Sequence, residues 1–124
     1  MDKRDTPKRP KNKWTKKSVP FVQKGEMKMY DVIIIGSGPA GISAGIYLKR
    51  AKKNVLIISK ENSALEKAEK IENYYGVESI SGKKLYEIGI KQAKALEIQI
   101  ETDEVTNISF ENNFVVTTVN SEYE

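Results

Sequence analysis

The stretch Tyr30–Gly45, which reads Y-D-V-I-I-I-G-S-G-P-A-G-I-S-A-G, decides the fold. Its apolar and mostly β-branched run 32–35 predicts a strand that is buried on both faces. Gly36, Gly38 and Gly41 then give the G-x-G-x-x-G spacing of a dinucleotide-binding turn. Apolar residues at helical intervals follow, so the sequence predicts a helix over 39–52 directly after the turn.

Each residue of this turn has a predicted role. Gly36 makes the tight turn out of the strand, Gly38 lets the backbone approach a pyrophosphate, and Gly41 lets the helix pack closely on the strand. Pro39 falls in the first helical turn, where a missing N–H group costs little. The unpaired N–H groups at the positive end of the helix predict an anion site. The alternative is an ordinary glycine-rich turn that binds nothing.

A second buried strand is predicted over 55–58, which completes a right-handed βαβ unit. A Rossmann site usually carries an acidic residue at the end of this strand for the ribose hydroxyls. Here that position is Ser59, and Lys60 and Glu61 follow it. The dinucleotide-binding fingerprint is therefore incomplete at this point.

The rest of the chain alternates between helical and strand patterns. Ser81 is a suitable N-cap for a helix whose apolar stripe is predicted to face the core. That stripe consists of Leu85, Ile88, Ala95 and Leu96. The further elements predicted are a short helix over 64–71, a turn over 73–76, a helix over 82–96, strands over 98–100, 105–110 and 114–119, a hairpin turn over 111–113 and a turn over 120–122.

The charge is distributed unevenly. Residues 1–28 carry ten Lys or Arg against three acidic residues, whereas 29–124 carry eleven against fourteen, so the net charge of +4 comes from the first segment. We expect 1–28 to be a disordered basic tail and 29–124 to be the folded part. One interpretation is that the tail binds nucleic acid or an anionic surface, with Trp14 free to stack on a base. The other is that it is only a solvated tail, or that the start codon has been assigned too far upstream. Partnership with nucleic acid is the less favoured interpretation.

Cysteine and histidine are absent from all 124 residues. The chain therefore has no thiol chemistry, no thiolate metal site and no histidine base of its own. No run is apolar enough to span a membrane, so a cytoplasmic location without a membrane partner is the expectation. No residue is predicted to be catalytic, because Ser37 and Tyr47 lack an accompanying base.

Several motifs, in order, resemble the amino-terminal part of the FAD domain of thioredoxin reductase-like flavoproteins, a branch of the pyridine nucleotide-disulfide oxidoreductase superfamily. The resemblance covers about 96 of the 124 residues. The motifs are G-S-G-P-A-G (36–41), I-Y-L-x-R-A (46–51), I-E-N-Y-Y-G (71–76), I-S-G-x-x-L (80–85), K-Q-A-K (91–94) and F-V-V-T-T (114–118).

The resemblance implies an α/β fold, a Rossmann-like three-layer FAD-binding domain with a parallel sheet and a β-meander. It implies that FAD is the cofactor and NAD(P)H the co-substrate, with electrons passed to a disulfide or another acceptor such as a thioredoxin-like protein or a small molecule. The whole protein would be a homodimer. The cofactor-binding residues implied are Gly36, Ser37, Gly38, Pro39, Ala40 and Gly41 at the pyrophosphate, Ser59, Lys60 and Glu61 beside the adenosine ribose, Asn73 near the flavin, and Val105 at the adenine.

The sequence departs from the family pattern in two places. The segment 62–65 replaces the usual Gly-Gly-Gln-Leu, which puts a glutamine contact in doubt, and Tyr75 replaces the family proline. The family's next strand, its NADPH domain and its Cys-x-x-Cys dithiol would all follow Glu124, so we expect this chain to be part of a longer protein. Alone it is expected to be inactive and to retain FAD weakly or not at all. A dithiol-free flavoprotein of the same fold and a non-catalytic nucleotide-binding module are the alternatives.

Overall fold

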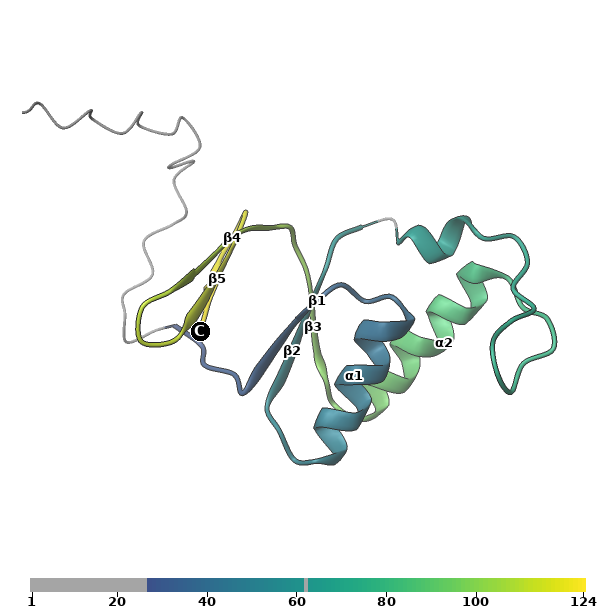
Figure 1. Ribbon diagram of the computed structural model, residues 1–124, viewed down its shortest axis with the longest axis horizontal. Helices are drawn as coiled ribbons and strands as arrows, with labels where there is room; N and C mark the ends of the chain where they lie inside the picture. The colour runs from purple at the N-terminus through teal and green to yellow at the C-terminus, as the bar shows by residue number, and fades with distance from the viewer. Residues whose placement is uncertain (1–26, 62) are drawn as a thin grey trace, which may run out of the picture.

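A parallel sheet lies between two helices on one side and an antiparallel sheet on the other (Figure 1). The computed structural model describes residues 27–61 and 63–124. The parallel sheet has the order β1-β2-β3, and the antiparallel sheet the order β4-β5-β6. The elements are β1 (Val32–Ile35), α1 (Pro39–Arg50), β2 (Val55–Ser59), the 3₁₀ helix η1 (Ala64–Lys67), α2 (Gly82–Ala95), β3 (Gln99–Thr102), β4 (Val105–Phe110), β5 (Phe114–Thr118) and β6 (Glu122–Tyr123). The predicted α/β fold with a parallel sheet and a β-meander is confirmed.

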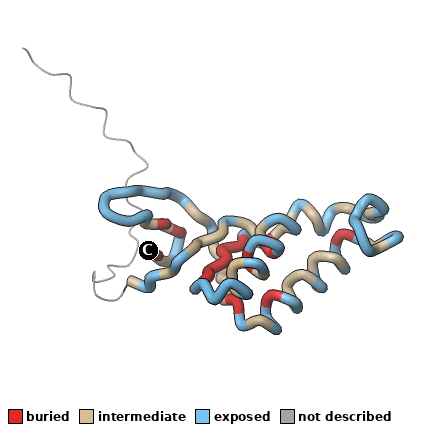
Figure 2. Tube along the Cα trace, turned by 60° about the horizontal axis from the view of Figure 1, so that its bottom comes forward, coloured by how far each residue is buried: buried red, intermediate tan, exposed pale blue. Residues whose placement is uncertain are grey.

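Strand β2 is the centre of the molecule, and all five of its residues are buried. Because side chains alternate along a strand, Ile57 faces the helices and packs with Ile42 and Ala93. Leu56 points the other way and packs with Val116 of the antiparallel sheet. The apolar run is therefore continuous because both faces are covered. Figure 2 shows the resulting group of buried residues in the middle of the molecule.

Both long helices form where the sequence predicts them. Helix α1 begins at Pro39 and ends two residues earlier than predicted, since the backbone of Lys52 turns to a φ of 61°. The Ser81 hydroxyl caps α2 by accepting a hydrogen bond of 3.2 Å from the N–H of Lys84. The predicted core-facing stripe of α2 is partly wrong: Ile88 and Ala95 are exposed, and the residues that pack into the core are Ile90, Ala93 and Leu96.

The segment between β2 and α2 contains less regular structure than predicted. The helix expected over 64–71 is only the single 3₁₀ turn η1. It ends because Ala68 takes an extended conformation and its carbonyl accepts a 2.7 Å hydrogen bond from the N–H of Gly82. Beyond it, two isolated bridges, Ile71 to Ile80 and Tyr74 to Val77, hold the loop 71–80.

The carboxyl-terminal strands differ from the prediction in their boundaries. Strand β3 extends to Thr102, two residues beyond the predicted end. The predicted turn over 120–122 is wrong at its last residue, because Glu122 belongs to β6 and pairs with Thr117. Burial explains the difference: Tyr123 is 8% exposed and packs in the second core cluster with Leu56.

The predicted basic tail falls almost entirely on residues 1–26, which lie outside those described, as does Trp14. Lys28, the last residue assigned to that tail, forms a parallel bridge with Tyr123, and its carbonyl accepts a 3.0 Å hydrogen bond from the N–H of Glu124. Over 27–61 and 63–124, none of the helices has the length and apolar character needed to cross a membrane.

Candidate nucleotide-binding site

The glycine-rich turn lies where β1 and β2 end. Gly36 leaves β1 with a φ of 110°, a conformation that a residue with a side chain adopts only under strain. Its N–H still donates a 2.8 Å hydrogen bond to the carbonyl of Ile58. The turn is therefore attached to the central strand of the sheet at the point where the chain reverses.

Gly38 is the N-cap of α1 and presents a bare backbone. Its φ of −67° and ψ of −178° are ordinary, and a Cβ atom placed there would have nothing within 4 Å. No side chain of the described residues caps the helix, and Pro39 occupies its first turn. The first N–H groups of a helix have no partner within the helix, so those of Ala40 and Gly41 are available to an anion. Open space, unpaired donors and a positive helix end together fit a pyrophosphate.

Gly41 and Gly45 serve packing between helix and sheet. A Cβ atom on Gly41 would lie 2.0 Å from the carbonyl oxygen of Gly36, and one on Gly45 would lie 2.9 Å from Cδ1 of Ile57. Both distances are shorter than any real contact of a Cβ atom with carbon or oxygen. The helix can therefore approach the sheet this closely only because position 41 is glycine, whereas the end of the Ile57 side chain could shift away from a Cβ atom on Gly45.

Three hydroxyl groups meet behind the turn. Ser37, between the two first glycines, and Ser59, at the end of β2, are each 5% exposed, and their Oγ atoms are hydrogen-bonded to each other. The phenol oxygen of Tyr86, from α2, lies 3.2 Å from Ser37 Oγ. The Ser59 hydroxyl also donates to the carbonyl of Lys60 at 3.3 Å. Nothing in the sequence indicates a role for Tyr86, because it is 49 residues from Ser37 and only the packing of α2 brings the two together.

The residues predicted to border the adenosine lie at the edge between the two sheets. Lys60 Nζ forms a 2.8 Å salt bridge with Oε1 of Glu104, which immediately precedes Val105. Both side chains are more than half exposed, so the pair adds little stability, but it links the end of β2 with the start of β4. Val105 packs on the second core cluster, whereas Glu61 is exposed. Ser59, Lys60 and Val105 are thus placed near one another.

Asp103 supports this edge from the chain that joins β3 to β4. Its N–H donates a 3.0 Å hydrogen bond to the carbonyl of Ser59, and its carboxylate accepts from the N–H of Glu104 and the amide of Asn120. Burial alone would raise the pKa of Asp103, but these hydrogen bonds, with the Thr118 hydroxyl, hold the pKa below its ordinary value. A lowered pKa means that this carboxylate stabilises the fold above its unfolded-state pKa, and that the contribution is lost as the pH falls through the folded-state pKa.

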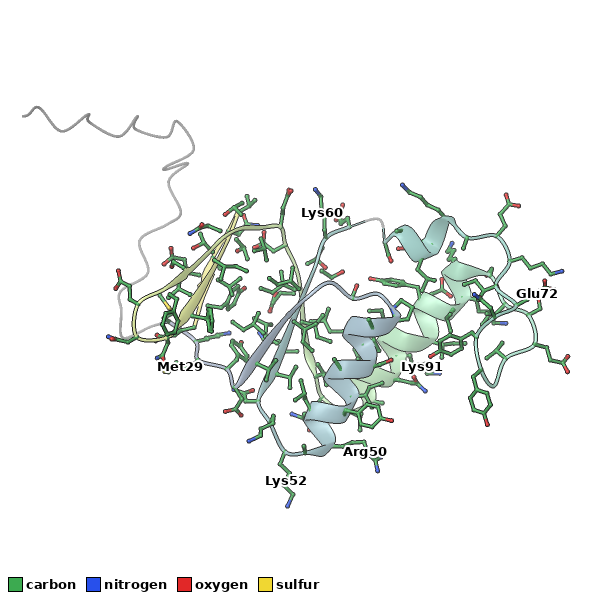
Figure 3. The ribbon with its side chains drawn as sticks, viewed as in Figure 1. Met29, Arg50, Lys52, Lys60, Glu72 and Lys91 are labelled. Carbon is green, nitrogen blue, oxygen red and sulfur yellow. The ribbon has the colours of Figure 1, made fainter. Side chains whose placement is uncertain are left out.

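Asn73 lies apart from the other predicted residues. It is exposed in the loop 71–80, and in the part of the chain that the structure describes its side chain makes no hydrogen bond to the turn. Figure 3 shows its neighbour Glu72 on the outlying loop, far from Lys60 at the end of β2. The adjacent Tyr74, however, lines a crevice of about 210 Å³ that also reaches Ser37, Gly38 and Pro39.

The crevice explains the exposed side of α2. It lies between α1, α2 and the loop, and its walls include Leu85, Ile88 and Gly89 of α2. Ile88 is therefore exposed because it faces an open crevice instead of the core. Over 27–61 and 63–124, no group of three or more His, Cys, Asp or Glu side chains is placed to hold a metal ion.

Comparison with known proteins gives a consistent result. The family model "Pyridine nucleotide-disulphide oxidoreductase" matches residues 30–124. Thioredoxin reductase of Bacillus subtilis is 44% identical over 71 residues, which are 56% of this chain and 22% of that protein. The crystal structure of thioredoxin reductase from Streptococcus pyogenes superposes with a TM-score of 0.72 at 33% identity, covering 77% of this chain and 32% of that one.

A ferredoxin-flavin thioredoxin reductase from Clostridium acetobutylicum also matches, with a TM-score of 0.70 and 37% identity over 78% of this chain and 35% of that chain. The chain thus spans about a third or less of the length of the relatives that it matches.

Proposed function

This chain belongs to the pyridine nucleotide-disulphide oxidoreductase family, and from that membership we propose that it is the FAD-binding portion of a thioredoxin reductase-like flavoprotein oxidoreductase. Bound FAD would supply a flavin that takes hydride from NAD(P)H and passes the electrons to a disulfide or another acceptor. The residues of this chain bind and orient the cofactor.

One observation carries the proposal, and it is the geometry of the turn from β1 to α1. The turn combines a glycine at a φ of 110°, a second glycine with open space at its Cβ position, and an uncapped helix N-terminus. A turn that only reversed the chain direction would not need this open space at position 38. A pyrophosphate bound by backbone N–H groups does need it, because a Cβ atom there would take its place.

The remaining contacts follow the shape of the site. The backbone of 36–41 holds the pyrophosphate, and Ser59, Lys60 and Glu61 at the end of β2 border the adenosine ribose. The backbone of Val105 meets the adenine, and the salt bridge of its neighbour Glu104 with Lys60 supports this assignment by linking the start of β4 with the end of β2. Asn73 then reaches the flavin from the loop beyond the crevice.

The chemistry needs groups that these 124 residues do not carry. The chain has no cysteine, so a disulfide acceptor belongs to another part of the protein or to a thioredoxin-like partner. We assign no catalytic role to any residue of this chain. We propose that the full-length protein is a cytoplasmic homodimer.

A second candidate is a flavoprotein of the same fold that uses another electron partner and no dithiol. The match to a ferredoxin-flavin thioredoxin reductase at 37% identity supports a ferredoxin as the other electron partner. The lack of a dithiol is part of the hypothesis and has no support from this match. Both candidates need the same FAD site, and they differ only in residues outside this chain.

The test is a titration of the ¹⁵N-labelled 124-residue chain with ADP, the half of FAD that contacts the turn. We expect ADP to shift the amide signals of 59–61, of Val105 and of every residue of 36–41 except Pro39, which has no N–H group. Gly38→Ala should weaken ADP binding by more than about tenfold, because its Cβ occupies the space of the pyrophosphate. Gly89→Ala is the control, since its Cβ would meet Ile42 at an ordinary 3.6 Å. Undiminished ADP binding by Gly38→Ala would contradict the proposal.

A further inference from the structure

The three hydroxyls behind the glycine-rich turn form a chain with a fixed direction. The carbonyl of Lys60 can only accept, so the Ser59 hydroxyl donates its proton to that carbonyl. Ser59 then has to accept from Ser37, and Ser37 has to accept from the phenol of Tyr86. The order of donation is therefore Tyr86 to Ser37 to Ser59 to the Lys60 carbonyl.

We propose that Tyr86 is a positioning residue for the nucleotide: its phenol anchors Ser37 and so holds the glycine-rich turn in its anion-binding shape. The inference rests on the proposed function, because the anion is the pyrophosphate of the bound nucleotide. Tyr86 does not touch the reacting atoms, and it acts through Ser37 alone.

The turn needs such an anchor because its backbone is unusually free. Ser37 stands between two glycines, each of which has more accessible backbone conformations than any other residue. A buried Ser37 side chain that accepts from one hydroxyl and donates to another can occupy only one orientation. That orientation fixes the peptide groups on both sides, including those that lead into the first turn of α1.

The anchor also ties α2 to the turn and to the end of β2, two elements that are already joined by the hydrogen bond from the N–H of Gly36 to the carbonyl of Ile58. Tyr86 comes from α2, Ser37 from the turn before α1, and Ser59 from the end of β2. Leaving Ser37 without its donor would leave a buried polar group under-satisfied, which is costly in a water-poor interior. The network therefore opposes any movement of the turn away from α2.

A consequence follows for the ribose. The Ser59 hydroxyl has one proton, which the Lys60 carbonyl receives, and Ser37 occupies one of its acceptor positions. It therefore has no proton to donate to a ribose oxygen. Side-chain recognition of the ribose falls to Lys60 and Glu61, while Ser59 contributes by its place in the anchor.

The experiment compares Tyr86→Phe with Tyr47→Phe in the 124-residue chain. Tyr86→Phe removes one oxygen and keeps the ring. Tyr47 is 78% exposed on α1, so its phenylalanine variant is a matched control. We expect Tyr86→Phe to weaken ADP binding by roughly two- to tenfold, the range for one lost hydrogen bond, and Tyr47→Phe to have no effect.

Two further readouts separate anchoring from general stability. The first is amide hydrogen exchange without ligand: Tyr86→Phe should speed exchange at Gly36 and Ile42, the amides that bond across and within the turn, and leave the amides of β5 unchanged. The second is a double-mutant cycle, in which Tyr86→Phe should cause no additional loss of ADP affinity once Ser37→Ala is present.

Each outcome decides between the two proposals. If the wild-type chain does not bind ADP, the proposed function fails, and the exchange rates at Gly36 and Ile42 still show whether Tyr86 anchors the turn. Unchanged exchange at these amides, or equal acceleration throughout the chain, would overturn the anchoring role. ADP affinity that is equal in wild type and Tyr86→Phe would overturn the link to the nucleotide.

Discussion

The glycine-rich turn 36–41 and the loop 71–80 both carry predicted cofactor residues, but the structure holds them in different ways. The turn is bonded to β2 through the N–H of Gly36, packed against the sheet at Gly41 and anchored through Ser37. The loop is held by two isolated bridges and has exposed residues at its tip, among them Tyr75, which is fully exposed.

This difference indicates that the two halves of the site contribute differently to binding. A group that is already in place costs little conformational entropy when the ligand arrives, whereas a loose segment has to be ordered at that moment. Under the proposed function, the turn is therefore a preformed site for the pyrophosphate. The loop is then a contact that depends on being ordered around the rest of the cofactor.

The largest effect is expected from Gly41→Ala. The added Cβ would lie 2.0 Å from the carbonyl oxygen of Gly36 and 3.0 Å from its carbon, and backbone atoms cannot rotate away as a side chain can. We expect a loss of about 3 kcal/mol or more in the free energy of unfolding, which is a large part of the stability of a small domain. Urea denaturation followed by far-ultraviolet circular dichroism measures it.

Gly38→Ala is the matched variant in the same turn. Its Cβ meets nothing, so its cost should stay below about 1 kcal/mol, the scale of an unfavourable N-cap residue. Equal destabilisation by the two variants would mean that the close approach of α1 to the sheet does not hold the turn in place.

The same contrast explains what the sequence can predict. The turn, both long helices and the parallel sheet follow from local patterns: a β-branched run, the spacing of three glycines and the Ser81 cap. Each of these patterns lies within or directly beside the element that it predicts, and tertiary contacts reinforce it. The backbone geometry of the turn, on which the proposed pyrophosphate contacts rest, is predictable for the same reason.

The other features depend on contacts between distant parts of the chain. The helix predicted over 64–71 stops at η1 because Ala68 bonds to Gly82, and Ile88 is exposed because the crevice lies beside it. The hydrogen bond between Tyr86 and Ser37 cannot be predicted from the sequence, since no periodicity relates the two residues. In such cases tertiary contacts override local propensity.

A smaller effect, confined to the loop side, is expected from Gly82→Ala. Its Cβ would lie 1.8 Å from the carbonyl oxygen of Leu65, so η1 has to move away from the first turn of α2. Because η1 has little other support, we expect most of the strain of about 1–3 kcal/mol to be relieved there and the sheet to stay intact. Faster trypsin cleavage after Lys67 and Lys70 would report this movement.

Gly89→Ala, in the same helix, is the control for that experiment, because its Cβ would make only ordinary contacts with Ile42. If Gly82→Ala unfolds the chain as completely as Gly41→Ala, the loop and the turn are parts of one cooperative unit. The distinction between a preformed half and a loosely held half would then be wrong.

The smallest effect on stability, and the sharpest test of the loop, is expected from Asn73→Ala. Asn73 is exposed, so its loss should change the free energy of unfolding by less than about 0.5 kcal/mol. ADP binding should not change, because ADP ends at the pyrophosphate, while FAD binding should weaken roughly two- to tenfold through one lost hydrogen bond. The exposed hairpin residue Asn112 provides a matched Asn→Ala control. Equal losses of affinity for ADP and FAD would place Asn73 at the turn instead of the flavin. An unchanged affinity for FAD would remove Asn73 from the site, and the proposed binding residues would then be those of the turn and the end of β2.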